Sequence, residues 1–218
     1  MKPFAPLPVD AVTSLYAHQG PPENTAKHAA LVAKYGFACR TLLGKLLYAH
    51  VMWWPDIGYA TITLSKFSTC PHDHHFAMLK KVAKCLGATK DWGIIYRWSQ
   101  PDTSLPTANF IRSTMDSELP EFLTVDTQEP VAFLDAAHAN DPRNHQSTTG
   151  YAFLLCGGAI SYRCKTQSIT ATSSTEGEFL AAVATAKHAR YMRALSQTQD
   201  KSHNVGTYRS FSTGIVER

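Results

Sequence analysis

The sequence predicts an α+β protein: a helical segment comes first, and a three-stranded meander followed by one long helix comes second. Three observations predict this order. Apolar residues recur at helical spacing between residues 35 and 98. Three short apolar runs, separated by turn residues, lie between residues 131 and 164. An alanine-rich stretch then follows Ser173 and Glu176, whose spacing is that of a helix capping box.

Composition and charge narrow the class of protein. Of the 218 residues, 44% are hydrophobic and 17% charged, which is typical of a globular chain rather than a disordered one. The formal net charge of +4 is compatible with nucleic-acid binding. No apolar run is long enough to span a membrane, and the N-terminus lacks the apolar core of a signal peptide, so we expect no membrane association and an intracellular location, cytoplasmic or nuclear. Five cysteines without a C-x-x-C pair predict free thiols.

The chain divides into five parts on these patterns. We expect an irregular, proline-rich leader at residues 1–34 and a helical segment at 35–98. A proline-containing linker is predicted at 99–129, the meander and its helix at 130–195, and a polar tail without periodicity at 196–218.

Within the helical segment, three helices and one strand are predicted. Leu42–Val51 carries the clearest helical repeat, Pro55 suits the first turn of a second helix, and residues 74–86 form a third. Residues 93–98 (G-I-I-Y-R-W) are typical of a strand. The third helix has Lys80, Lys81 and Lys84 on the side opposite its apolar face.

In the second part, the apolar runs at residues 131–134, 150–156 and 159–164 predict the three strands, and Gly157-Gly158 predicts the hairpin between the last two. The helix that follows is predicted to end near Leu195.

Two carboxylates occupy positions where a metal site would be built. Asp135 lies late in the first strand, and Glu178 lies one turn into the long helix. Carboxylate oxygens are the ligands that Mg²⁺ prefers, and two such ions can activate water for phosphodiester hydrolysis. The simpler interpretation is that Glu178 is a solvated acid stabilised near a helix N-terminus and that Glu176 is a capping residue.

Residues 131–182, which include V-A-F-L-D-A-A, Q-S-T-T-G-Y, K-T-Q-S-I-T-A-T-S-S-T and E-G-E-F, resemble the ribonuclease H region of copia-type retrotransposon Pol polyproteins. That family typically shows D-A-D-W-A, R-S-T-S-G-Y, K-K-Q-x-x-V-A-L-S-S-T and E-A-E-Y in the same order. Upstream, Y-G-F-A-C-R-T-L-L-G-K-L-L-Y-A-H-V and W-P-D-I-G-Y-A are similar to the segment after the polymerase palm. The resemblance covers about residues 35–195.

The resemblance implies the end of a reverse-transcriptase region (thumb- or connection-like, residues 35–98) followed by the N-terminal half of a ribonuclease H-like domain. It implies that Asp135 and Glu178 are catalytic carboxylates that bind Mg²⁺ in the parent family. It also implies that Lys80, Lys81 and Lys84 contact the phosphates of an RNA–DNA hybrid or duplex. An ordinary solvated helix face is the alternative for these lysines.

Several departures from the family predict a catalytically incomplete, truncated protein. No Y-x-D-D polymerase motif occurs. Ala137 and His138 stand where the family has Asp and Trp, and residues 196–218 contain no D-N-Q motif. Since two carboxylates cannot fix two metal ions for in-line hydrolysis, we expect no functional cofactor and no activity of this chain alone. The missing strands would leave Val131–Leu134 as an unpaired edge open to self-association.

Two other functions stay open: a ribonuclease H completed by another chain, and a repurposed interaction or effector-like protein that uses the exposed sheet. Arg40-Thr41-Leu42-Leu43 resembles the start of the R-x-L-R motif of oomycete effectors, but it lies inside a predicted helix. The cluster of Cys70, His72, Asp73, His74 and His75 contains metal-ligand residue types without a closed zinc spacing. We interpret it as a helix start with incidental histidines.

Overall fold

The computed structural model describes residues 5–8, 11–94, 96, 130–156, 158–200 and 215–216. They form two compact units that interleave along the chain. The first unit comprises residues 1–93, 137–148 and 163–172, and the second comprises residues 94–136, 149–162 and 173–218. The predicted linker at 99–129 and most of the predicted tail lie outside the described residues.

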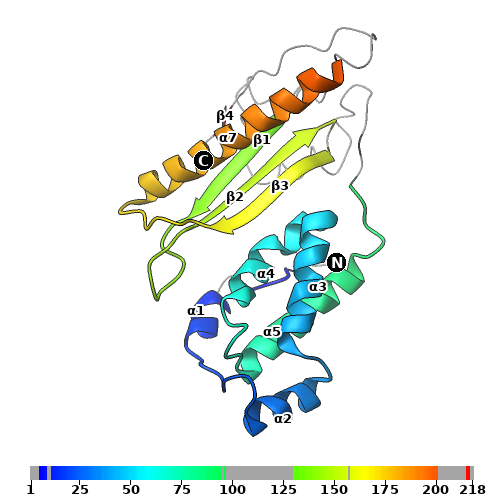
Figure 1. The fold of residues 1–218 in the computed structure, drawn as a ribbon, viewed down its shortest axis with the longest axis vertical. Helices are drawn as coiled ribbons and strands as arrows, with labels where there is room; N and C mark the ends of the chain where they lie inside the picture. The colour runs from blue at the N-terminus through cyan, green and yellow to red at the C-terminus, as the bar shows by residue number, and fades with distance from the viewer. Residues whose placement is uncertain are drawn as a thin grey trace, which may run out of the picture. The chain divides into compact units, whose positions relative to one another are not determined.

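The first unit contains a helical bundle around an apolar core (Figure 1). Its described helices are α1 (Ala11–Tyr16), α2 (Ala26–Tyr35), α3 (Cys39–Met52), α4 (Gly58–Ser65) and α5 (Asp73–Ala88), with a short 3₁₀ helix at Pro55–Ile57. The core side chains include Leu43, Leu46, Ile57, Leu64, Phe76, Leu79 and Val82. The three helices predicted within residues 35–98 are therefore confirmed, and Pro55 stands at the first position of the 3₁₀ turn that leads into α4.

The prediction of an irregular leader at residues 1–34 is wrong. Helices α1 and α2 occupy much of that range, and Leu15 of α1 is 0% exposed in the core. Thr25 caps α2, because its hydroxyl accepts a hydrogen bond from the His28 N–H at 3.2 Å. Such short helices are stabilised mainly by tertiary packing, which a local pattern cannot reveal.

The second unit is built on three neighbouring strands whose sequence runs were predicted. They are β1 (Val131–Ala137), β2 (Thr148–Leu155) and β3 (Gly158–Thr166), and they form an antiparallel meander in the order β3-β2-β1 (Figure 1). A two-residue strand, β4 (Ile215–Val216), pairs in parallel with β1.

The pairing of β4 corrects the prediction of an unpaired edge at Val131–Leu134. Ala132 lies opposite Ile215, and Phe133 lies opposite Val216. The prediction failed because a two-residue strand carries no periodicity from which it could be recognised. The edge of β1 is thus partly covered by the C-terminal residues of the chain.

The strand predicted at residues 93–98 is also wrong for its described members. Gly93, Ile94 and Tyr96 are not in a strand. The hydroxyl of Tyr96 donates a hydrogen bond to the Ala159 carbonyl at 2.7 Å. A Cβ on Gly158 would lie 2.6 Å from the Tyr96 ring. Ile94 and Tyr96 therefore pack on the start of β3 instead of joining the sheet.

Helix α7 (Ser174–Asp200) lies along one face of the strands (Figure 1). The predicted start of the helix is confirmed, because the Ser173 hydroxyl accepts a hydrogen bond from the Glu176 N–H at 3.1 Å. The helix ends at Asp200, beyond the predicted Leu195. Gly177, Ala181 and Thr185 are buried at four-residue spacing, and Ala181 packs in a cluster with residues of β1 and β2. Three small residues on one face let the helix approach the sheet closely.

The close approach of Gly20 to Pro71 gives a test of how the leader docks. The Gly20 N–H donates to the Cys70 carbonyl at 3.1 Å, and a Cβ on Gly20 would lie 2.1 Å from the Pro71 carbonyl carbon. Gly20→Ala should therefore lower the free energy of unfolding by about 1–3 kcal/mol in urea titrations. As the control, Gly87→Ala adds a methyl group to open space in α5 and should be neutral or stabilising by up to about 1 kcal/mol. Equal effects of the two substitutions would show that residues 11–35 do not dock as described.

Candidate functional site

The first candidate residues, Asp135 and Glu178, come from β1 and from the second turn of α7. The Glu178 Oε1 accepts a hydrogen bond from the Ala136 N–H at 3.3 Å. Glu178 is thus brought to the main chain next to Asp135. Asp135 itself is exposed within β1. Because side chains alternate along a strand, Asp135 points away from the face on which Leu134 packs in the cluster beneath α7.

This geometry limits what the two carboxylates can do together. Glu178 reaches the main chain of β1 beside Asp135, but its recorded bond goes to a backbone N–H, and the Asp135 side chain points away from the face that packs beneath α7. Among the residues that the structure describes, no group of three or more His, Cys, Asp or Glu side chains is arranged to hold a metal ion. A two-metal hydrolytic site needs several oxygen ligands for each ion.

The predicted basic face of α5 lies opposite the buried face of that helix. Phe76, Leu79 and Val82 are each 0% exposed in the core. Lys80 and Lys84 are exposed, and Lys81 is half-buried. The one acidic residue of α5 is Asp73, which forms an ion pair with Lys34 of α2. Lys80 and Lys84 therefore lie on a helix face without acidic neighbours in the helix.

The sequence interpretation of a helix start at this cluster is confirmed, but the histidines are not incidental, because His72 and His75 have structural roles. The His72 side chain accepts a hydrogen bond from the His74 N–H, and the His75 Nδ1 accepts one from the His72 N–H at 2.8 Å. The other ring nitrogen, His75 Nε2, lies 2.9 Å from the Leu15 carbonyl and must donate to it. Burial lowers the pKa of His75, which keeps the ring neutral. The hydrogen bond from this ring to the Leu15 carbonyl joins α1 to α5.

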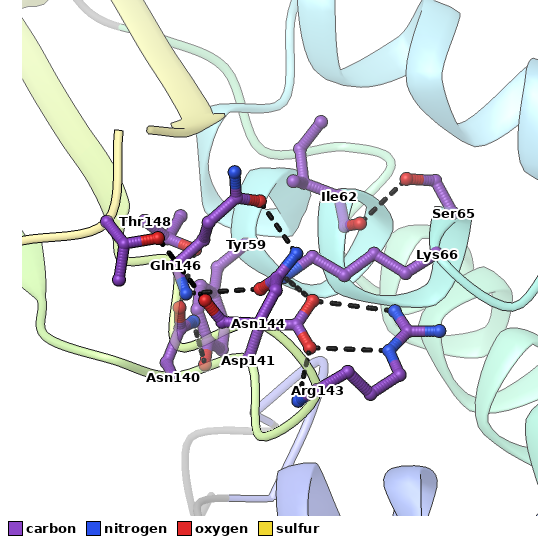
Figure 2. Close-up of polar contacts among 11 residues, drawn as sticks. Tyr59, Ile62, Ser65, Lys66, Asn140, Asp141, Arg143, Asn144, Gln146 and Thr148 are labelled. Carbon is purple, nitrogen blue, oxygen red and sulfur yellow. Dashed lines mark hydrogen bonds and ion pairs between the residues drawn. The ribbon is translucent and has the colours of Figure 1, made fainter. Parts of the chain in front are cut away.

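A buried polar network that the sequence did not predict holds the segment 138–147 on the helices of the first unit (Figure 2). The Asp141 side chain is 3% exposed, and its Oδ2 lies 3.1 Å from the Lys66 Nζ. Arg143 donates to both carboxylate oxygens of Asp141, at 3.3 and 3.4 Å, and its guanidinium carbon lies 5.0 Å from the centre of the Tyr16 ring. Asp141-Pro142 is a turn signal from which the loop could have been inferred.

The charge state of Asp141 follows from its partners. Burial alone would raise the pKa of this carboxyl, but the hydrogen bonds from Arg143 and Lys66 outweigh burial and lower the pKa to about 2. The carboxylate therefore stays ionised and neutralises two cations at the edge of the helical core. These contacts hold the loop on the helices of the first unit.

Removing this carboxylate should destabilise the protein in a pH-dependent way. Asp141→Asn leaves the largely buried Lys66 ammonium without its counter-charge, so the free energy of unfolding should fall by about 3–5 kcal/mol near neutral pH. Because the folded-state pKa lies below the ordinary 3.8, the stabilisation by Asp141 is complete above pH 3.8 and is lost as the pH falls toward about 2. Chemical denaturation over a pH series measures both effects.

The matched control for this prediction is Asp91→Asn, which removes an exposed acid from a turn and should change stability by less than about 0.5 kcal/mol. If Asp141→Asn also stayed within that range, or if the acid-dependent loss of stability were unchanged in it, the network would not stabilise the fold.

Two further sequence predictions concern thiols and membranes. All five cysteines are free, as predicted. Cys164 lies on β3, and burial raises the pKa of its thiol to about 11.

Among the described residues, no helix combines the length and the apolar character that crossing a membrane requires.

Comparison with known proteins gives the class of the chain. It is 29% identical over 174 residues to the retrovirus-related Pol polyprotein from transposon TNT 1-94 of Nicotiana tabacum, a match that covers 80% of this chain and 11% of the polyprotein. It is 28% identical over 156 residues to the corresponding polyprotein from transposon RE2 of Arabidopsis thaliana, over 72% of this chain and 9% of that protein. The chain is thus related to retrotransposon Pol polyproteins and spans about a tenth of their length.

A shorter relative shows the family. The chain is 32% identical over 139 residues to the secreted RxLR effector protein 161 of Plasmopara viticola, a match that covers 64% of this chain and 80% of that protein. The chain belongs to the same family as this protein. No family model matches the sequence, and no solved structure matches it.

The R-x-L-R-like residues 40–43 lie within α3. Leu43 is buried in the core, whereas Arg40 is exposed and forms an ion pair with Glu23 at 3.1 Å.

Proposed function

We propose that this chain is a fragment of a copia-type retrotransposon Pol polyprotein, comprising the end of the reverse-transcriptase region and the opening part of a ribonuclease H domain. The observation that carries the proposal is the order of its elements: a helical unit, an antiparallel meander and then a long helix, in a chain matched over 80% of its length by a Pol polyprotein. In this assignment the fragment binds nucleic acid and does not cleave it alone.

The position of Glu178 supports the ribonuclease H assignment. A carboxylate on the first strand and another on the first helix are the parts of such a site that this segment would supply. Glu178 accepts its hydrogen bond from the residue directly after Asp135, as expected for a helix acid that approaches the first strand.

Mg²⁺, the ion of the parent family, fits these residues incompletely. Asp135 and Glu178 would be its ligands, yet one oxygen of Glu178 is already bonded to a backbone N–H. Ala137 and His138 supply no further carboxylate. The proposed function therefore contains no hydrolytic step by this chain.

The lysines of α5 are the proposed nucleic-acid contact. Lys80 and Lys84 are exposed one turn apart on a helix whose opposite face is anchored in the core. Such a row contacts phosphates, which gives binding that does not depend on sequence and weakens with salt.

Neutralising this row should weaken binding to an RNA–DNA hybrid. Lys80→Gln, Lys81→Gln and Lys84→Gln together should lower affinity for a fluorescent hybrid and reduce the salt dependence of binding by about one phosphate contact for each lysine that touches the backbone. Fluorescence anisotropy over a salt series measures this. The control Lys27→Gln, Lys45→Gln and Lys90→Gln removes the same charge from exposed positions elsewhere. Equal losses in the two triple variants would reject α5 as the contact.

The absence of cleavage by this chain alone is a second prediction. Incubation of the full chain with a labelled RNA–DNA hybrid and Mg²⁺ should release no RNA above the level of the Asp135→Ala variant, because two carboxylates do not complete a two-metal site. Cleavage that Asp135→Ala abolishes would contradict this and would favour a working enzyme. Cleavage that appears after adding a second chain would favour a ribonuclease H completed in trans.

A second candidate function is an interaction or effector-like protein, which the relative in Plasmopara viticola favours. The surface for it is the β1 edge at Val131–Leu134, which β4 covers at two residues, so it offers limited room for an added strand or for self-association. Binding to the hybrid distinguishes the candidates, since an interaction protein of this kind would show no salt-dependent affinity for nucleic acid.

A further inference from the structure

Two histidines supply the side chains that cap helix α5 at its N-terminus. The His72 Nδ1 accepts a hydrogen bond from the His74 N–H at 3.3 Å, and the His75 Nδ1 accepts one from the His72 N–H at 2.8 Å. This reciprocal arrangement is a capping box, in which the usual residues are Ser or Thr and, three positions later, Glu or Gln. Here both acceptors are imidazole nitrogens, and an imidazole nitrogen accepts a hydrogen bond only while it carries no proton.

The same histidines hold helix α1 on α5. The His75 side chain is buried, the Phe67 ring stacks on it at 4.2 Å, and its Nε2 donates to the Leu15 carbonyl at 2.9 Å. Beside it, the His74 Nε2 lies 3.0 Å from the Ser14 hydroxyl of α1. Since His75 donates from Nε2 and accepts at Nδ1, both of its hydrogen bonds require one neutral tautomer. The contact between the two helices therefore depends on the protonation state of this ring.

Further histidines face this capping box. The charges that act on His75 are those of His72, His74 and His18. The His18 ring, which follows α1, stacks on the His72 ring with centroids 4.8 Å apart, and its centroid lies 5.6 Å from that of His74. The His18 Nδ1 lies 2.8 Å from the Ser14 carbonyl, which keeps the ring in place. Imidazolium charges at these distances repel one another, so protonation opposes the docked arrangement.

The acid of this helix start, Asp73, is already neutralised by a cation of another helix. Its carboxylate accepts a hydrogen bond from the Lys34 ammonium of α2, which holds the pKa of Asp73 below its usual 3.8. The neighbouring Tyr35 hydroxyl donates to the Asp73 carbonyl at 3.2 Å. Asp73 therefore stays ionised between about pH 7 and 5, where imidazoles ordinarily titrate. The contact of α2 with α5 does not change its charge in that range, whereas the contact of α1 does.

The direction of the pH effect follows from burial. Burial lowers the pKa of His75 below its usual 6.5, so the ring takes up a proton more readily when α1 is detached than when it is docked. The stabilisation is complete above the usual pKa and is lost as the pH falls through the lower pKa of the docked ring. For each such ring, the ratio of detached to docked α1 rises by up to about tenfold for each pH unit of acidification.

We propose that the His72–His75 capping box is an acid-sensitive switch: when these rings take up protons, α1 detaches from α5 while α2 stays docked. Protonation turns each Nδ1 from an acceptor into a donor that faces a backbone N–H, which breaks both caps of α5. Detachment of α1 would expose Leu15, which is 0% exposed in the docked arrangement. The switch uses none of the lysines of the proposed nucleic-acid contact and does not depend on that function.

Hydrogen–deuterium exchange of the full chain at about pH 7.5 and about pH 5.5, corrected for the intrinsic effect of pH on exchange, tests the switch. Protection of residues 11–16 should fall by about tenfold or more at the lower pH, while protection of α2 and α3 stays unchanged. The variant His72→Ser with His75→Gln makes a capping box whose acceptors do not titrate in this range, and its protection should not depend on pH. The matched control His138→Gln removes an exposed histidine elsewhere and should respond as the wild type does.

The single variant His72→Ser covers the case in which Gln does not fit the buried site of His75, because Ser is itself a preferred N-cap. A loss of protection at residues 11–16 that is smaller in His72→Ser than in the wild type and in His138→Gln supports the proposal. Equal protection of these residues at both pH values in the wild type overturns it. A loss that is unchanged in His72→Ser, or one that affects α2 and α3 equally, also overturns it.

Discussion

The close seating of α7 on the sheet is the constraint on which the functional arguments for the second unit depend. Gly177, Ala181 and Thr185 can face the strands because they are small; a leucine at any of these positions would push the helix away. Once this face is buried, the rotation of the helix is fixed. Glu178 then reaches the main chain of β1, and Arg190 must face solvent. The position of Glu178 is therefore a consequence of how α7 packs on the sheet.

Ion pairing sorts the basic residues of the chain into two groups. Lys34, Arg40, Lys66 and Arg143 each form an ion pair with a carboxylate, and the Lys66–Asp141 pair is largely buried. Because each of these charges has a partner of opposite sign, these cations contribute little field outside the protein. Lys80 and Lys84 form no ion pair among the described residues, and the same holds for the exposed control positions Lys27, Lys45 and Lys90. The charge of this second group can contact a polyanion.

Sequence patterns predicted the elements whose signals are local. The strands β1 to β3 and the helices α3, α5 and α7 were recognised because the apolar period and the capping residue lie within each segment. Helix α1 was missed, since Leu15 and His75 make their contact over a separation of 60 residues. Helix α2 was missed because its contacts with Asp73, from Lys34 and Tyr35, are also distant in sequence. The strand expected at Gly93–Trp98 has the right residue types, yet the Tyr96 side chain packs on Gly158 instead. The Asp141 network was also missed, because Asp141 and its partner Lys66 are distant in sequence.

The candidate site was only partly predictable, because the packing of the fold and a catalytic site depend on different residues. Asp135 is an exposed strand residue, and exchanging such an acid changes stability little, so the packing of this fold neither requires nor protects a complete set of carboxylates. The contact of α7 with the sheet uses different residues, which are small or apolar. A chain can therefore keep this fold with Ala137 and His138, which supply no carboxylate, directly after β1 residue Asp135 and its neighbour. The proposed phosphate contact of α5 requires only exposed bases on an anchored helix, and Lys80 and Lys84 meet this requirement without any metal ligand.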